Sequence, residues 1–447
     1  MGQAETEVAI LGAGPAGIAA AYGLASAGVE VTLIDSGIPV VSRVESLPPS
    51  GLALAESLGL ADAIASATLG RAQEIRMLWR ATPERQVFGA EAPLLLDRVL
   101  LHCALGSAVT GLRRITARAR ILAPEGDRPR VQVGDCILSA RIILDARGRA
   151  AQRSRAGLVA LAFEGRQADT AFPAMQIEAL AAGWLWASTL PDGRVSGQLF
   201  LPAVALAGLD REARQGLLQR HLAATFPGMA LRPGAVAPAM LTAVDDPVAE
   251  PGLLRLGDAA LARDPIASHG LIHALRSGGQ AAVAVATLLD PACEPQAALA
   301  FLRDRHRRAL VAARTATARA YADQSRLRSP FWERQAPPLP TAPQPWPSLS
   351  RPLALVAPLR QVPVLQPDRI RWAQGLWLET SGEAVPHLGP ISAPALARLL
   401  TPPAPLTELS ARLERAVGQA AAHAILRRLL DEGALASLAQ TEVARSA

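Results

Sequence analysis

A glycine-rich segment near the start of the sequence has the spacing of a phosphate-binding loop. Gly12, Gly14 and Gly17 form a GxGxxG pattern, with Pro15 and Ala16 among the intervening residues. Glycines at these positions permit a tight turn and the close approach of a pyrophosphate, and the free N–H groups that open a helix attract the anion. We therefore expect this segment to hold the pyrophosphate of a dinucleotide.

The elements on either side of this pattern complete a nucleotide-binding unit. Residues 7–11 and 29–35 are short apolar runs that predict strands, and residues 18–27 favour a helix between them. Asp35 ends the second strand, where its carboxylate can accept hydrogen bonds from an adenosine ribose. Ser36 follows it and is assigned to the same site. The strand, helix and strand make one βαβ unit.

A second motif lies far downstream, in the segment Gly257–Ala260 (GDAA), which is followed by Pro265 and by His269–Leu271 (HGL). Together with the first motif it resembles the FAD-dependent monooxygenases and halogenases. The resemblance implies that Asp258 binds the ribityl chain of FAD. It also implies that the loop from Pro265 to Gly270 and Leu271 lies beside the isoalloxazine ring, where a helix start stabilises negative charge.

Three shorter stretches extend the same resemblance over about residues 5–285. They are residues 44–49 (VESLPP), 97–98 (DR) and 145–149 (DARGR). Arg43 and Arg98 are predicted to contact FAD as well, because a guanidinium offers a two-pronged donor to phosphate.

The resemblance also implies a reaction. Reduced flavin would react with molecular oxygen to give a C4a-hydroperoxide, which hydroxylates an electron-rich aromatic ring. Only one dinucleotide pattern is visible, so the electrons would come from transiently bound NAD(P)H or from a reductase partner. His269 and Glu45 are the candidate catalytic residues, for proton transfer near the flavin. A purely structural role is the alternative for each of them.

Trp184 and Trp186 resemble the paired tryptophans of the tryptophan halogenases and are candidates for a substrate pocket. Their alternative role is packing on one face of a strand. In those halogenases an essential lysine delivers the halogenating species, but all 45 basic residues of this sequence are arginine. We therefore expect an enzyme that is not a lysine-dependent halogenase.

Composition shifts predict how the chain is divided. The predicted fold is of the α/β class, with a discontinuous Rossmann-like FAD-binding domain over 1–153 and 245–330. A substrate domain over 154–244 contains an antiparallel sheet, because the turn signal at 191–193 (PDG) separates two alternating runs. A proline-rich linker over 335–352 precedes a small, mainly helical, winged-helix-like module over 353–447.

Helical spacing in the C-terminal module predicts three helices, over 393–400, 406–417 and 419–431. Thr407 is a candidate N-cap and Gly433 a candidate C-cap. Such modules resemble the peptide-recognition modules of enzymes that modify ribosomally made peptides. The resemblance therefore implies a partner polypeptide.

The remaining composition narrows the function further. A net charge of +6 without a run of basic residues argues against nucleic-acid binding. No apolar run is long enough to span a membrane, and the acidic N-terminus is unlike a signal peptide, so we expect a cytoplasmic protein. Cys103, Cys136 and Cys293 lack metal-binding spacings and are expected to be small buried residues, and no metal is predicted.

These inferences lead to one function and two alternatives. The helix-opening SHGL segment, the extra module and the missing lysine resemble the flavoprotein monooxygenases that mature the tryptophylquinone cofactor of quinohaemoprotein amine dehydrogenase. The leading hypothesis is therefore hydroxylation of an aromatic group, such as a tryptophan side chain of a partner polypeptide. The alternatives are a flavin-linked reductase of an isoprenoid or other alkene, and a non-catalytic FAD-containing assembly factor.

Overall fold

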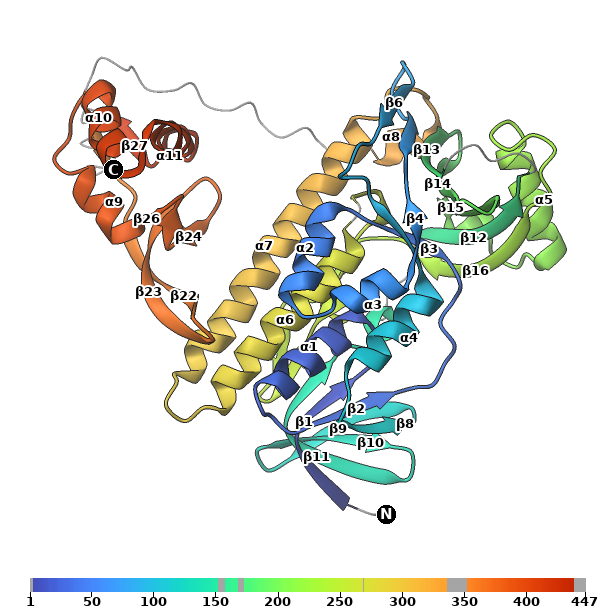
Figure 1. Cartoon of the computed structure of the whole chain (residues 1–447), viewed down its shortest axis with the longest axis horizontal. Coiled ribbons are helices and arrows are strands. Elements are labelled where there is room, and N and C mark those ends of the chain that lie inside the picture. The colour runs from blue at the N-terminus through green and yellow to red at the C-terminus, as the bar shows by residue number, and fades with distance from the viewer. Residues whose placement is uncertain (1–2, 152–156, 168–172, 268, 336–351, 438–447) are drawn as a thin grey trace. The chain divides into compact units, whose positions relative to one another are not determined.

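The computed structural model describes residues 3–151, 157–167, 173–267, 269–335 and 352–437 (Figure 1). The chain divides into two compact units. Unit 1 comprises Met1–Ala286 and Leu302–Leu339, and unit 2 comprises Thr287–Phe301 and Pro340–Ala447. Of the linker predicted over 335–352, residues 336–351 lie outside the described residues. Among the residues that are described, no helix is long and apolar enough to cross a membrane.

The first sheet of unit 1 has a parallel centre, in the order β18-β19-β11-β1-β2-β8. In β1, β2 and β11 the runs 8–11, 31–34 and 142–145 are fully buried, as expected for a parallel sheet covered on both faces. The βαβ unit predicted at the N-terminus is confirmed. The strands are β1 Gln3–Leu11, β2 Val31–Asp35, β8 Arg113–Thr116, β9 Ala119–Glu125, β10 Arg128–Val133, β11 Cys136–Asp145, β18 Val248–Glu250 and β19 Leu253–Arg255.

The carboxyl ends of the parallel strands meet at one edge of this sheet. The register pairs Leu11 with Asp145, and Asp145 with Arg255. Helix α1 (Pro15–Ser26) begins directly after the end of β1, with a proline in its first turn, where no backbone donor is lost. The loops that follow β1, β2, β11 and β19 are therefore gathered at this edge, which is where ligands bind in such folds.

The second sheet of unit 1 has seven strands in the order β16-β12-β15-β14-β13-β5-β6. All its pairs are antiparallel except that of β13 with β5. The predicted hairpin is confirmed: Gly193 adopts a φ of 82° in the turn between β14 and β15. The strands are β5 Glu74–Leu78, β6 Glu84–Val87, β12 Leu158–Arg166, β13 Ala174–Leu180, β14 Gly183–Thr189, β15 Arg194–Pro202 and β16 Arg232–Pro238.

Smaller elements complete unit 1. A three-stranded sheet joins β3 (Val44–Leu47), β7 (Leu94–Asp97) and β4 (Thr68–Arg71), and β17 (Thr242–Ala243) pairs with β20 (Leu261–Ala262). The remaining helices are α2 Pro49–Ser57, α3 Ala61–Ser66, α4 Arg98–Ala108, α5 Arg211–Leu222 and α8 Pro330–Gln335. Two long helices, α6 (Gly270–Leu289) and α7 (Pro295–Ala322), lie mostly in unit 1 and are labelled in Figure 1.

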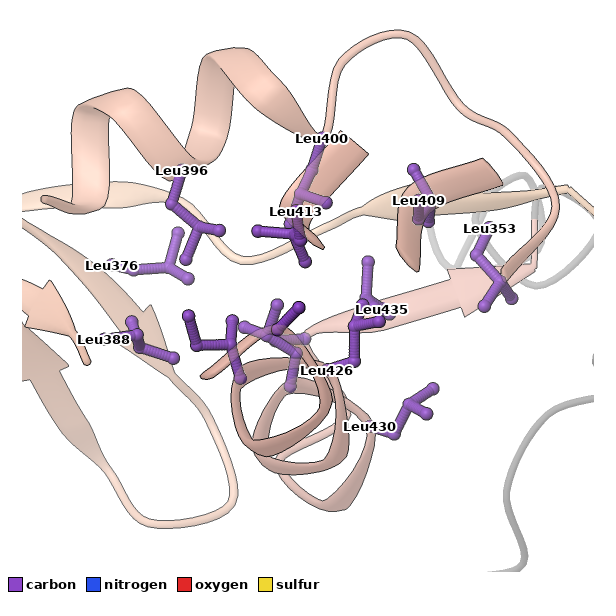
Figure 2. Close-up of a cluster of buried hydrophobic side chains, with 14 of the residues drawn as sticks. Leu353, Leu376, Leu388, Leu396, Leu400, Leu409, Leu413, Leu426, Leu430 and Leu435 are labelled. Carbon is purple, nitrogen blue, oxygen red and sulfur yellow. The ribbon is translucent and has the colours of Figure 1, made fainter. Parts of the chain in front are cut away.

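Unit 2 has its own leucine-rich core. The three predicted helices are confirmed as α9 (Ala393–Leu399), α10 (Leu406–Val417) and α11 (Gln419–Asp431). Figure 2 shows leucines from these helices directed toward leucines of the neighbouring strands. The strands are β21 Leu353–Leu355, β22 Leu359–Gln366, β23 Arg369–Leu378, β24 Glu383–Val385, β25 His387–Leu388, β26 Ile391–Ser392 and β27 Leu435–Ser437.

Local details of two predictions differ from the structure. Gly433 does end α11, with a φ of 67° and an N–H that donates to Leu430. The Thr407 prediction is wrong because α10 begins one residue earlier, after Pro405, whose ring already fixes the entry to the helix. The expectation of buried cysteines is also wrong: Cys103 lies on the outer face of α4 and Cys136 at a hairpin turn, and both are exposed.

Candidate active site

The glycine segment after β1 forms a tight turn that leaves one side open. Gly12 has a φ of 108°, and a Cβ atom there would lie 2.5 Å from the carbonyl oxygen of Ala146. At Gly14 a Cβ would meet nothing within 4 Å, and this residue caps α1 without any side-chain hydrogen bond. The turn is therefore closely packed on the Gly12 side and open on the Gly14 side. The open side offers space and uncapped N–H donors for a pyrophosphate.

The acidic residue predicted to bind ribose lies at the same sheet edge. Asp35 ends β2 and is half-buried, and its backbone carbonyl accepts a hydrogen bond from Ala117 at 2.8 Å. Ser36 is exposed, and its Oγ accepts the N–H of Ile38 at 3.3 Å. The contacts of these two residues with a nucleotide remain predictions.

A cluster of five charged side chains, here called the acid–arginine cluster, collects residues far apart in the sequence. Arg43 contacts Glu45 on β3 at 2.6 Å, and Arg98 at the start of α4 approaches the same carboxylate at 3.5 Å. Arg149, in the short helix η1 (Gly148–Ala151), lies 3.4 Å from Asp258 in η3 (Gly257–Ala259). The structure thus brings Arg43, Glu45, Arg98 and Asp258 together as predicted candidates.

Electrostatics differ between the two carboxylates of this cluster. Burial acts to raise the pKa of Glu45, but Arg98, Arg43 and Arg149 outweigh it and hold that pKa below the ordinary value. For Asp258 burial dominates and raises the pKa, although the same arginines oppose it. Glu45 is therefore held as an anion among arginines, and the Asp258 carboxyl group lies beside Arg149, where it can form hydrogen bonds with hydroxyl groups.

Arg149 was not among the predicted site residues. The guanidinium donates to the carbonyl oxygen of Pro238, which ties the end of the first sheet to the strand β16. Within the described part of the chain, the Nε atom of Arg98 is buried and has no hydrogen-bond partner. The Nε of Arg149 faces the Asp258 carboxylate at 3.4 Å. An orphaned donor such as the Nε of Arg98 is uncommon in folded proteins and fits an anionic or polar ligand. The sequence signal was the basic residue that follows Gly148 at the strand end.

The loop before α6 has an unusual backbone. His269 is the only non-glycine residue with positive φ, at 71°, among the residues that the structure describes. Its side chain is exposed, and Nδ1 lies 3.0 Å from the carbonyl oxygen of Ala267. Pro265 begins the short helix η4 (Pro265–Ala267), and Gly270 and Leu271 begin α6. Backbone strain of this kind concentrates at functional sites.

A buried acid in the same loop, Asp264, was not among the predicted site residues. Asp264 is 6% exposed, and burial raises the pKa of its carboxyl to about 6. The hydroxyl of Tyr321, near the end of α7, donates to this carboxylate at 3.4 Å, and the N–H of Ile266 donates at 3.0 Å. Asp264 thus anchors the loop to α7. No spacing in the sequence links two residues that are so far apart.

The paired tryptophans lie on one face of β14. Trp184 is 2% exposed and stacks on Phe200 with ring centroids 3.7 Å apart. Trp186 is half-buried beside the same aromatic cluster, which also contains Trp79 and Tyr321. Ile266 of the loop before α6 packs against this cluster too. The aromatic cluster therefore supports that loop, and a role of Trp184 and Trp186 in a substrate pocket remains a prediction.

Taken as a cofactor site, these residues fit FAD. The open side of the glycine turn suits a pyrophosphate, the orphaned Nε of Arg98 suits a polar group of the cofactor, and the start of α6 suits the flavin ring. Gly278 brings α6 against α1, since a Cβ there would lie 2.8 Å from the Cβ of Ala19. The two predicted cofactor-binding helices are thus held together by close packing.

Comparison with known proteins agrees with this assignment. Residues 5–109 match a family model described as an FAD-binding domain. Tryptophan 2-halogenase of Chondromyces crocatus is 25% identical over 374 residues, which cover 74% of this chain and 70% of that protein. The 3-demethoxyubiquinol 3-hydroxylase of Escherichia coli (strain K12) is 28% identical over 305 residues, which cover 60% of this chain and 76% of that protein.

A solved structure is similar over nearly the whole chain. It is described as the peptidyl tryptophan dihydroxylase QhpG, essential for tryptophylquinone cofactor biogenesis, and it is 25% identical with a TM-score of 0.72. The similarity covers 96% of this chain and 100% of that one. The α/β fold predicted from the sequence is confirmed. Residues 5–109 of the chain therefore carry an FAD-binding domain, and the chain as a whole is similar to FAD-dependent hydroxylases and halogenases.

Proposed function

We propose that FAD is held across the carboxyl edge of the parallel sheet. The glycine turn at Gly12–Gly17 receives the pyrophosphate and Asp35 receives the ribose. The Asp258 carboxylate accepts hydrogen bonds from the ribityl hydroxyls, beside its ion-pair partner Arg149. Arg43, Arg98 and Arg149 supply donors around it. The acid–arginine cluster carries this proposal, because it joins residues from both predicted halves of the cofactor site.

Within this site we assign Glu45 a positioning role rather than the role of a base. Its carboxylate contacts two guanidinium groups, which lower its pKa and so weaken it as a proton acceptor. Holding Arg43 and Arg98 in place is the role that this geometry supports. His269 is the better candidate for moving a proton, because its ring is exposed beside the start of α6.

We propose that the reaction is hydroxylation of an electron-rich aromatic ring, for which bound reduced flavin would activate molecular oxygen. Electrons would come from NAD(P)H or a reductase partner. The hydroxylase relative supports hydroxylation, and the absence of lysine from the sequence argues against a lysine-dependent halogenation. The residues of this chain would bind the cofactor, exclude water through the aromatic cluster, and transfer a proton at His269.

We further propose that the ring is the indole of a tryptophan within a polypeptide. The similarity to the peptidyl tryptophan dihydroxylase extends through the C-terminal unit, since 96% of this chain is covered. A small-molecule hydroxylase has no evident need for a winged-helix-like module. Recognition of a partner polypeptide is the use that we assign to unit 2, as an extension of this proposal.

An oxygen-labelling experiment tests this function. Purified FAD-loaded protein, chemically reduced without air, is mixed with isotopically heavy oxygen and a tryptophan-containing polypeptide, and the polypeptide is analysed by mass spectrometry. We expect heavy oxygen on a tryptophan, and much less with His269→Ala. A matched polypeptide with phenylalanine in place of tryptophan is the control. Label on neither polypeptide would contradict the proposal and direct attention to the reductase and assembly-factor alternatives.

A further inference from the structure

Four basic side chains converge in unit 1 where α6 and α7 meet the two-stranded sheet of β17 and β20. Arg263 directly follows β20 and directly precedes Asp264 of the loop before α6. His273 and Arg276 are three residues apart on α6 and therefore share a helix face. His306 of α7 is held by the carbonyl oxygen of Val244, at 2.8 Å, just beyond β17. We call these four residues the basic cluster.

The basic cluster contains buried nitrogen atoms without hydrogen-bond partners. In the described regions of the chain, the Nε of Arg263 and the Nε2 of His273 are both inaccessible to solvent and have no hydrogen-bond partner. Buried polar groups are almost always paired in folded proteins, so two unpaired nitrogen atoms at one place need an explanation. An acceptor supplied from outside the chain would provide one.

The cluster also lacks a compensating carboxylate among the described residues. Burial, together with Arg263, His306 and Arg276, lowers the pKa of His273 to about 4, and burial and Arg276 lower the pKa of Arg263. None of the described carboxylates contributes to either shift. The adjacent Asp264 does not compensate them, because its carboxylate is engaged by Tyr321 and by the N–H of Ile266.

We propose that the basic cluster is a binding site for an oxyanion of the carboxylate or phosphate type. The Arg263 guanidinium and the His273 ring would donate to it, and Arg276 and His306 would add favourable charge. Oxyanions suit the site better than halides, because the planar fork of a guanidinium matches two oxygens of one group. The site shares no residue with the acid–arginine cluster, in which Arg43 and Arg149 already face carboxylates.

Thermal unfolding of the FAD-loaded protein tests the site with simple salts. Potassium phosphate, potassium acetate and potassium chloride are compared at equal ionic strength. We expect phosphate or acetate to raise the melting temperature by about 1–3 °C with saturation, and chloride to have no saturable effect. The more effective salt tells whether phosphate or carboxylate chemistry is preferred. Equal effects of all three salts would overturn the proposal.

Substitutions locate the effect. Arg263→Gln and the exposed Arg276→Gln should each raise the half-saturating concentration of the effective salt at least about tenfold, because a charge-assisted hydrogen bond or a close charge is lost. Arg276 is exposed, so its replacement should leave folding intact. Arg314→Gln, at an exposed position on α7, is the matched control and should retain the wild-type response. An unchanged response in both cluster variants would refute the site.

Histidine NMR provides a second readout that does not depend on turnover. The sequence contains only seven histidines, so selective labelling should resolve the His273 signal. Saturating phosphate or acetate should raise the pKa of His273 from about 4 toward its ordinary value of 6.5. A His273 pKa that stays unchanged at saturation would contradict binding at this cluster.

Discussion

Two charged clusters of unit 1 differ in how their charged side chains are paired. The acid–arginine cluster sets Glu45 and Asp258 among three arginines, so its charges are largely compensated within the chain. The basic cluster around His273 has four basic groups and no compensating carboxylate among the described residues. Leaving the half-buried Arg263 guanidinium without a partner is costly, which is why the second cluster calls for an anion, whereas the first suits a polar cofactor.

The two clusters also differ in whether their residues belong to recognisable sequence motifs. The acid–arginine cluster is assembled from loops at one sheet edge, and most of its members lie in short motifs. The basic cluster is assembled by two long helices and a two-stranded sheet, from residues without a shared motif. A charge cluster of the second kind becomes visible only when the chain is folded.

Removing an acid from the first cluster should have the largest effect. Asp258→Ala leaves Arg149 without its carboxylate and removes the proposed ribityl contact. We expect the affinity for FAD to fall by about 10- to 100-fold, the loss typical of a charge-assisted hydrogen bond. Fluorescence titration of the apoprotein with FAD measures it. Asp127→Ala, at an exposed turn, is the control, and equal affinities of both variants would count against the role of Asp258.

The raised pKa of Asp264, in the loop before α6, predicts how the stability of the protein depends on pH. Its folded-state pKa is raised to about 6 from 3.8, so the folded protein favours the protonated acid. That contribution to stability is full below the unfolded pKa and is lost as the pH rises through about 6. Between pH 4 and 7, wild type should lose up to about 3 kcal/mol relative to Asp264→Asn.

Urea unfolding at several pH values measures this difference for Asp264→Asn. The Asp127→Asn variant should follow wild type, because Asp127 is exposed in a turn. Parallel stability curves for wild type and Asp264→Asn would show that the Asp264 carboxyl titrates normally, and that burial does not raise its pKa.

Placing an acidic side chain in the basic cluster should partly compensate its charge, as carboxylates do in the acid–arginine cluster. Arg276→Glu places a carboxylate three residues from His273 on the same helix face. In wild type, folding resists protonation of His273, so stability falls as the pH drops from 6.5 toward 4. The new carboxylate should reduce that fall and add about 1 kcal/mol or less near pH 6, since position 276 is exposed. Arg314→Glu is the control, and identical pH profiles would contradict the prediction.

The smallest effect concerns the loop that carries His269. A φ of 71° costs a residue with a Cβ about 1 kcal/mol, whereas glycine adopts it freely. His269→Gly should therefore be more stable than His269→Ala by about 1 kcal/mol or less. Urea unfolding of the two variants measures the difference. Equal stabilities would show that the backbone at this position is not strained.

The sequence predicted elements better than it predicted the contacts between them. The GxGxxG turn, the hairpin at Gly193 and the helices of unit 2 follow from local rules of turns and periodicity, and all three are confirmed. Arg149 and the pair of Asp264 and Tyr321 could not be predicted, because their contacts depend on how distant segments pack. The left-handed backbone of His269 was likewise invisible, since only glycine signals such a conformation.

The most direct test of the proposed function is a single turnover of the reduced, FAD-loaded protein with a limiting amount of oxygen. The measurement compares the flavin reoxidised with the oxygen atoms incorporated into a tryptophan-containing polypeptide. The proposal predicts that the two amounts rise together when the polypeptide is present, and that hydrogen peroxide accounts for the oxygen when it is absent. Full conversion of oxygen to hydrogen peroxide with every tryptophan polypeptide would contradict a protein-directed monooxygenase.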